Sequence, residues 1–287
     1  MRLLLGSLLV SMVLGAGVPS IDDLLNLRTA RGAEISPDGK YVVYSVSETD
    51  WEQDAFVTHL WVAEVSGGRV WQLTRGKKSE GAPAWSPDGQ WIAFTREGEG
   101  GKSQVFALRP DGGEAVALSK SETGVQSFAW SPDGSQIAYT SADKRGEERK
   151  KVFGEFEVVR RDYQHSHLWT FAVAEAMRGP VAGTQRTKGT AYSVGGFAWA
   201  PEGGRIAFSA TKNPDLVQGG TSDIYVLTLE GNGVKKIVDT PGPDRGPVWS
   251  PDGKFIAFSS AMGNPKFFHA NARIAVVGAE GGAVRSI

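Results

Sequence analysis

The chain has 287 residues, of which 40% are hydrophobic, so it can bury a large core and is not a disordered protein. It contains no cysteine, which excludes disulfide bonds, thiolate catalysis and zinc sites built on cysteine. Its formal net charge of −1 lacks the basic surplus typical of nucleic-acid-binding proteins, so we expect no nucleic-acid partner.

Residues 1–17 have the pattern of a secretory signal peptide. Arg2 precedes a short apolar run that ends in small residues at Gly15 to Gly17. A membrane anchor is the alternative, but the run is shorter than the about 20 residues that a membrane-spanning helix needs. We therefore expect the mature chain in the periplasm or outside the cell, without stable membrane insertion after the signal is removed.

Residues 18–31 predict a leader segment that contains a short helix. Ser20 is placed to cap this helix, with Asp23 at the third helical position. The leucines at 24, 25 and 27 then need an apolar partner, either on the following domain or on another surface. We expect that domain to span residues 32–287.

A motif of the form Trp-Ser-Pro-Asp-Gly recurs through residues 32–287. Counted between the serine positions or their equivalent, the spacings are 50, 45, 69 and 50 residues, close to the ~40–50 residues of a four-stranded propeller blade. The five copies are Ile35–Gly39, Trp85–Gly89, Trp130–Gly134, Trp199–Gly203 and Trp249–Gly253.

Each copy is followed by the same order of short strands, as in the third repeat. Residues 127–131 and 136–140 form two strands on either side of the turn, residues 167–173 form a third strand, and in the other repeats a Gly-containing turn leads to a fourth. Serine, proline and glycine at their places in the motif suit a type I turn. We therefore interpret the repeated aspartates as turn residues rather than catalytic groups, and the repeated tryptophans as packing between blades.

These features predict an all-β fold, a β-propeller of four-stranded blades with a short N-terminal helix. Five repeats are visible, which indicates part of a seven- or eight-bladed propeller. Five blades that close on themselves are the alternative, since propellers of roughly four to eight blades exist.

The spacing of 69 residues indicates an insertion at about residues 142–165, between the second and third strands of the third blade. We expect it to stand over one mouth of the propeller channel, on the face opposite the Pro-Asp-Gly turns. Its candidate substrate- or partner-binding residues are Glu155, Glu157, Arg160 and Arg161. Glu155 and Glu157 share a strand face and are suited to binding an ammonium group, although salt bridges to the two arginines are the alternative.

His165 and His167 also share a strand face, at a spacing that some zinc sites use. No third ligand is identifiable nearby, so we interpret both as hydrogen-bonding residues. We expect no metal site and no cofactor.

Several stretches together resemble the N-terminal propeller of the prolyl oligopeptidase family, most closely its acylaminoacyl-peptidase and dipeptidyl-peptidase branch. They are Asp23–Leu27, Ser36–Tyr44, Thr49–Trp51, Leu60–Trp61, Gln72–Thr74 and Arg161–Trp169. Periplasmic TolB-type propellers share the Pro-Asp-Gly repeats, whereas the leader helix and the insertion favour the peptidase branch.

The resemblance implies a C-terminal α/β-hydrolase domain with a Ser, Asp and His triad, and a propeller that admits only short peptides to it. This sequence has no Gly-x-Ser-x-Gly motif, so we predict no catalytic residues and no peptidase activity for the chain as it stands. The expected partners are peptide substrates and the missing hydrolase domain. The alternative function is a stand-alone periplasmic TolB-type scaffold that binds a protein or peptide.

Overall fold

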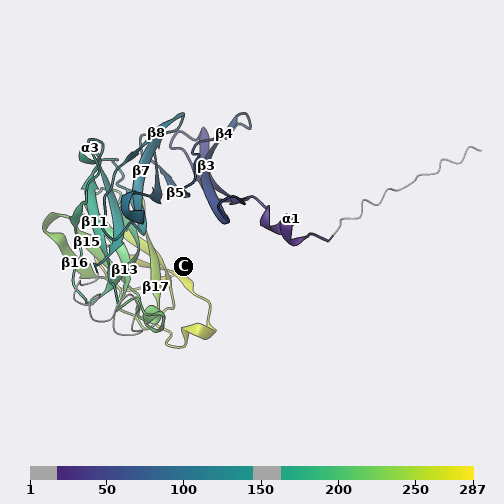
Figure 1. Cartoon of the computed structure of the whole chain (residues 1–287). Coiled ribbons are helices and arrows are strands. Elements are labelled where there is room, and N and C mark those ends of the chain that lie inside the picture. Colours follow the sequence, from purple (N-terminus) through teal and green to yellow (C-terminus); the bar gives the residue numbers. More distant parts are fainter. Residues whose placement is uncertain (1–17, 145–162) are drawn as a thin grey trace, which may run out of the picture.

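The computed structural model describes residues 18–144 and 163–287. Its strands form five four-stranded antiparallel sheets, each a meander in chain order, which we call the first to fifth blades (Figure 1). This confirms the predicted all-β propeller fold.

The first three blades comprise β1 (Thr29–Ile35), β2 (Tyr41–Asp50), β3 (Ala55–Glu64) and β4 (Val70–Gln72); β5 (Glu80–Trp85), β6 (Ile92–Glu97), β7 (Ser103–Arg109) and β8 (Gly112–Ala117); and β9 (Ser127–Trp130), β10 (Gln136–Ala142), β11 (Ser166–Ala172) and β12 (Thr184–Gln185). The other two comprise β13 (Ser193–Trp199), β14 (Arg205–Thr211), β15 (Asp223–Thr228) and β16 (Gly233–Lys236); and β17 (Asp244–Trp249), β18 (Phe255–Ser260), β19 (Arg273–Gly278) and β20 (Arg285–Ser286).

The described helices are short. They are α1 (Ile21–Leu25), α3 (Val173–Ala176), and four 3-10 turns, η1 (Glu99–Gly101), η2 (Leu216–Thr221), η3 (Glu230–Asn232) and η4 (Phe267–His269). The third blade departs from the sequence pattern here: Val173 begins α3 instead of ending a strand, and α3 takes the place of the tight turn before the fourth strand.

The repeated motif, Pro-Asp-Gly in four blades and Pro201-Glu202-Gly203 in the fourth, forms the turn between the first and second strands of each blade. In the third blade, the Gly134 N–H donates to the Ser131 carbonyl at 2.9 Å, and the Ser131 hydroxyl donates to Asp133 Oδ1 at 2.6 Å. The bond from the Ser131 hydroxyl, followed by bonds from the hydroxyl and N–H of Ser135, lowers the pKa of Asp133. The same serine–aspartate bond recurs at the turns beginning at Ser36, Ser86 and Ser250, so these aspartates act as turn residues.

The tryptophan before each turn connects its blade to the preceding one. Trp85, Trp130, Trp199 and Trp249 each donate their indole N–H, at 3.1 to 3.2 Å, to the backbone carbonyl of a residue in the previous blade, namely Glu34, Ala84, Ala129 and Ala198. Each acceptor residue directly precedes the tryptophan of its own blade; in the first blade, it directly precedes Ile35, which stands in the place of the tryptophan. Packing between blades is therefore one repeated contact.

The first strands of three blades, β1, β5 and β17, bend at the same place in the repeat. Gly32 and Gly246 adopt φ of +62°, and Ala82 occupies the equivalent position with φ of +49°. Pairing with the second strand shifts register around each of them. A residue with a Cβ is strained in this left-handed region, so the second blade carries a local cost that the two glycines avoid.

The blades form an open arc in which the first and fifth blades do not pack together (Figure 1). Ile35, which stands in the place of the tryptophan in the first blade, is 66% exposed. On the fifth blade, Val248 stands where the other blades offer the carbonyl acceptor, and it is 62% exposed. The two ends of the arc thus present uncovered sheet faces.

The leader helix α1 has the predicted capping box, in which Ser20 and Asp23 each bond the backbone N–H of the other. It is tied to the tip of the β2–β3 hairpin, where Trp51 Nε1 donates to Asn26 Oδ1 at 2.9 Å. None of its residues is buried, and Leu24 and Leu27 remain exposed. No helix in the described ranges is long and apolar enough to cross a membrane.

Candidate functional site

The insertion leaves the third blade at the end opposite the Pro-Asp-Gly turns. β10 ends at Ala142 and β11 begins at Ser166, which pair with each other. This end of the arc also carries the segments that connect one blade to the next, and we call it the connector face. The candidates Glu155, Glu157, Arg160 and Arg161 lie outside the described residues.

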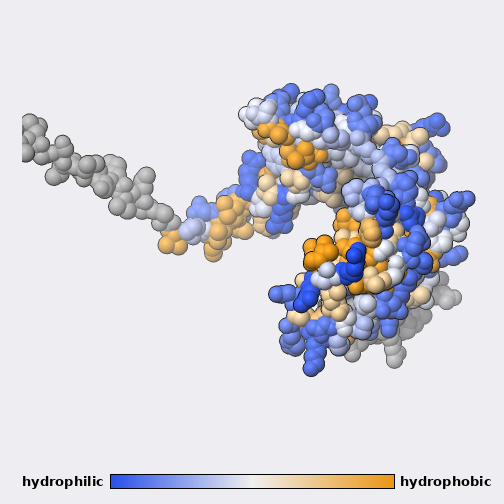
Figure 2. All heavy atoms as spheres, turned by 180° about the vertical axis from the view of Figure 1, so that it is seen from behind, coloured by the Kyte–Doolittle hydropathy of each residue, from blue (hydrophilic) through white to orange (hydrophobic). Residues whose placement is uncertain are grey.

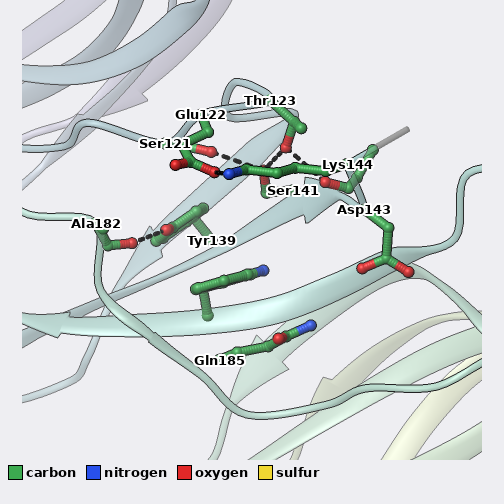
Figure 3. A pocket seen from close by; sticks show the side chains of 11 residues that line it. Ser121, Glu122, Thr123, Tyr139, Ser141, Asp143, Lys144, Ala182 and Gln185 are labelled. Carbon is green, nitrogen blue, oxygen red and sulfur yellow. Dashed lines mark hydrogen bonds and ion pairs between the residues drawn. The ribbon is translucent and has the colours of Figure 1, made fainter. Parts of the chain in front are cut away.

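A pocket of about 250 Å³ lies beside the base of the insertion (Figure 3). Its walls come from the connector between the second and third blades, from β10 with the two residues after it, from β11 and from the approach to β12. The lining residues are Ser121, Glu122, Thr123, Tyr139, Ser141, Ala142, Asp143, Lys144, Trp169, Ala182 and Gln185.

One wall of the pocket is a cluster of hydroxyl groups that bond to one another. The Ser141 hydroxyl lies 2.7 Å from that of Ser121 and 2.8 Å from that of Thr123, and it donates to the Gly124 carbonyl at 2.7 Å. Thr123 also donates to the Ala142 carbonyl. These bonds fix the connector against β10, so this wall is rigid and its hydroxyls are already paired.

The floor of the pocket is aromatic. The rings of Tyr139 and Trp169 stack with centroids 6.1 Å apart and planes 20° from parallel. The Tyr139 hydroxyl donates to the Ala182 carbonyl, and burial raises the pKa of Tyr139, so this phenol stays protonated. The Trp169 indole N–H is buried and has no hydrogen-bond partner within the described chain. A buried donor without an acceptor is costly, which favours a ligand that brings an acceptor to it.

A carboxylate completes the pocket. Asp143 Oδ2 lies 3.3 Å from Nε2 of His167, and the Asp143 side chain is 42% exposed. The contact has the distance of an ion pair but not the alignment of a good hydrogen bond. Burial lowers the pKa of His167, and Asp143 only partly opposes this shift, so the imidazole is neutral at neutral pH. Asp143 therefore keeps its negative charge available to a ligand.

Thr187, His167 and Asp143 form a chain that superficially resembles a catalytic triad. The Thr187 hydroxyl lies 3.2 Å from Nδ1 of His167 and accepts the N–H of Leu168 at 2.9 Å. Thr187 is 2% exposed and His167 is fully buried. A substrate cannot reach the Thr187 hydroxyl, so Thr187 is not a nucleophile. The three side chains instead serve to position Asp143.

The same hydroxyl contact recurs in other blades, which identifies it as structural. In the first and second blades, the connector hydroxyls of Thr74 and Ser119 accept the N–H of Leu60 and Val105, at 2.9 and 2.8 Å. Each hydroxyl also donates to a buried side chain, Glu80 Oε2 or Gln104 Oε1. Sequence reasoning missed this pattern because the side chain that each hydroxyl contacts differs from blade to blade.

His165 and His167, which the sequence analysis interprets as hydrogen-bonding residues, are both buried. The described residues contain no group of three or more His, Cys, Asp or Glu side chains arranged to hold a metal ion. His167 makes the contacts to Thr187 and Asp143 described above.

Comparison with known proteins relates the whole arc to two groups. Residues 26–172 match the family model described as the TolB beta propeller domain. The chain is 31% identical over 217 residues to dipeptidyl-peptidase 5 of Porphyromonas gingivalis, a match that covers 68% of this chain and 32% of that protein. It is also 30% identical over 91 residues to the uncharacterized peptidase YuxL of Bacillus subtilis, covering 32% of this chain and 14% of that protein. The chain thus spans less than a third of the length of these curated relatives.

Solved structures agree on the fold. An acylaminoacyl peptidase from Pyrococcus horikoshii superposes with a TM-score of 0.67 at 16% identity, over 91% of this chain and 39% of that one. TolB from Acinetobacter baumannii superposes with a TM-score of 0.52 at 13% identity, over 90% of this chain and 68% of that one. The chain therefore belongs to the TolB β-propeller domain family, and its sequence relatives include peptidases.

Proposed function

We propose that this chain is the N-terminal propeller of a secreted serine peptidase, and that it restricts the access of peptides to a hydrolase domain that the chain does not contain. The observation that carries this proposal is the match to dipeptidyl-peptidase 5, which covers 68% of the chain and only 32% of that protein. The signal-like residues 1–17 support secretion into the periplasm or the medium.

The pocket at the base of the insertion is the proposed contact for the peptide. The Asp143 carboxylate suits an ammonium group or an amide N–H, and the unpartnered Trp169 indole N–H suits a carbonyl oxygen. A peptide presents both kinds of group within a few ångströms of each other. Glu155, Glu157, Arg160 and Arg161 of the insertion are proposed to contact the same peptide or a partner domain.

Peptide binding tests the pocket directly. Titration of the purified chain with fluorescently labelled di- and tripeptides should give saturable binding. The variants Asp143→Asn and Trp169→Phe should each raise the Kd by about tenfold, because each loses one polar contact to the peptide. Glu122→Gln is the matched control, because Glu122 also lines the pocket but is neutralised by Lys144. Equal binding by all four proteins would contradict the proposal.

The peptidase assignment has its own test. The reading frame that follows the codon for Ile287 should encode a Gly-x-Ser-x-Gly motif, and the 287-residue chain alone should hydrolyse no dipeptidyl or acyl-peptide substrate. Turnover by the purified chain would contradict the assignment of catalysis to another domain.

A stand-alone TolB-type scaffold is the second candidate function. It is favoured by the superposition on TolB of Acinetobacter baumannii, which covers 68% of that chain rather than a minor part of it. A stop codon after Ile287, together with a folded chain that binds peptides without cleaving them, would favour this second function.

A further inference from the structure

A second cavity lies on the connector face, between the first and second blades, and we call it the second-blade cleft. Its volume is about 370 Å³, and its walls are the connector between these blades, the end of β6 and the turn before β7. Four of its lining residues are cationic, namely Arg75, Lys77, Lys78 and Arg96, and three are acidic. Hydrophilic residues cover most of the outer surface of the arc (Figure 2), so charge alone does not mark this cleft as a site.

The repeat shows that Arg96 is an exception. In four blades the second strand begins Ile-Ala, followed by an aromatic residue and then serine or threonine. These stretches are Ile92–Thr95, Ile137–Thr140, Ile206–Ser209 and Ile256–Ser259. The next residue is Ser141, Ala210 or Ser260 in the third, fourth and fifth blades, but Arg96 in the second. The blade needs only a small residue here, so folding does not explain the arginine.

The second-blade cleft and the pocket beside the insertion occupy equivalent places in successive blades. The pocket is lined by the connector before the third blade and by residues 141–144, and the cleft by the connector before the second blade and by residues 96–99. Ser141 and Arg96 therefore have the same position in the repeat. The second blade also supports the pocket, because the Gln104 amide donates to the Ser121 carbonyl at 2.7 Å and its Oε1 accepts the Ser121 N–H at 2.8 Å.

The Arg96 guanidinium is oriented by an aromatic ring and keeps its hydrogen-bond donors available. It lies 4.2 Å from the centroid of the Phe106 ring. Among the described residues, its ion-pair contact is with Glu80 Oε1 at 3.8 Å, which is too long for a hydrogen bond. Glu80 is buried, and its Oε2 contacts the Thr74 hydroxyl at 2.9 Å and His59 Nδ1 at 3.0 Å, so this carboxylate is used inside the fold. The Arg96 side chain is 26% exposed, so a ligand can reach it.

The connector adds two further cations to the cleft. Lys78 is paired with Glu97 at 3.3 Å. Arg75 and Lys77 are exposed and form no ion pair with another described residue. A guanidinium presents a fork of N–H donors that matches a carboxylate. The cleft thus suits a carboxylate held by Arg96, with Arg75 and Lys77 at its rim.

We propose that the second-blade cleft binds a carboxylate of the same peptide that contacts Asp143. This inference rests on the proposed function of the pocket beside the insertion. The two cavities carry opposite charge in neighbouring blades, so they suit the two charged groups of one short peptide. The carboxylate is the C-terminal group of the peptide or an acidic side chain, and both present the same chemistry to Arg96.

Calorimetric titration of the purified chain with unlabelled peptides tests the cleft. Alanine peptides of about two to eight residues, with a free amino terminus, span up to about 28 Å at about 3.5 Å per residue. Each is compared as the free acid and as the C-terminal amide. For peptides that reach both cavities, amidation should raise the Kd by about tenfold, because one charge-assisted contact is lost. An amide with glutamate as its last residue separates the two sources, since it regains affinity only if a side-chain carboxylate can enter the cleft.

Variants of the chain assign the effect to the cleft. Arg96→Gln should raise the Kd of the free acid by about tenfold and leave that of the amide unchanged. The double variant Arg75→Gln with Lys77→Gln changes only exposed residues and should act in the same direction, so the test does not depend on the buried contacts of Glu80. Lys102→Gln is the matched control, because it removes an exposed cation near the same turn that does not line the cleft, and both Kd values should stay unchanged. Far-UV circular dichroism checks that each variant is folded.

The outcomes separate this inference from the proposed function. If acid and amide bind equally at every length while Asp143→Asn still weakens binding, the cleft is not a carboxylate site and the proposed function stands. If Arg96→Gln weakens the acid and the amide equally, its effect is structural and the inference is wrong. If no peptide binds at all, both the inference and the proposed function are wrong.

Discussion

Replacing Trp199 by phenylalanine tests whether the repeated contact between blades stabilises the arc. Trp199 is 9% exposed and packs in a cluster with Ala138 and Leu168 of the third blade. Its indole N–H donates to the Ala129 carbonyl at 3.2 Å. The substitution keeps an aromatic ring at this position but removes the donor and part of the buried area.

The expected cost follows from these two losses. A hydrogen bond of this kind contributes about 0.5–1.5 kcal/mol net. The smaller ring removes on the order of 40 Å² of buried surface, which at about 25 cal/mol per Å² is about 1 kcal/mol. We therefore expect the free energy of unfolding to fall by about 2 kcal/mol.

Urea unfolding followed by far-UV circular dichroism measures this change. Ile35→Ala is the matched control, because Ile35 has the same place in the first blade but no preceding blade, and its loss should cost less than about 0.5 kcal/mol. If Trp199→Phe costs no more than Ile35→Ala, the contact between blades is not what stabilises the arc.

Three further predictions concern single positions. Ala82→Gly should raise the free energy of unfolding by about 0.5–1 kcal/mol, because it relieves a positive φ, and a loss of stability in the same urea assay would contradict this. Thr187→Val should lower it by about 1–3 kcal/mol, because the buried N–H of Leu168 loses its acceptor, and a neutral effect would show that water replaces the hydroxyl. Because the bond from Ser131 lowers the folded pKa of Asp133, its stabilising contribution is present above the unfolded pKa of about 3.9 and is lost as the pH falls through the folded value. Asp133→Asn should therefore destabilise the chain at pH 6 and differ little from the unmodified chain at about pH 2, and a difference independent of pH would contradict this.

The blades could be predicted from the sequence because one short motif specifies several levels of structure. In the third repeat, Ser131, Asp133 and Gly134 make the turn, and Trp130 before it makes the contact to the previous blade. The replacement of this tryptophan by Ile35 in the first repeat is visible in the sequence as well. The structure shows the consequence, which is that Ile35 makes no contact of the kind made by the four tryptophans and is 66% exposed.

The pocket was not predicted because its residues come from segments that no short motif joins. Asp143, Trp169 and Gln185 are brought together by the pairing of β10, β11 and β12, and none belongs to a repeated pattern. The short helix α3 was missed for a related reason. It follows a strand directly, in a position where the other blades have a tight turn.

Repetition separates structural polar groups from candidate functional ones. The connector hydroxyls of Thr74, Ser119 and Thr187 accept the same backbone N–H in three blades, so a requirement of the blade explains them. No equivalent contact in another blade explains the unpartnered indole of Trp169 or the available charge of Asp143. Both lie in the one blade that carries the insertion, beside its base. The needs of folding account for the first group. They leave the second group unexplained, and for this reason we propose the peptide contact at this pocket and not at the aspartates of the turns.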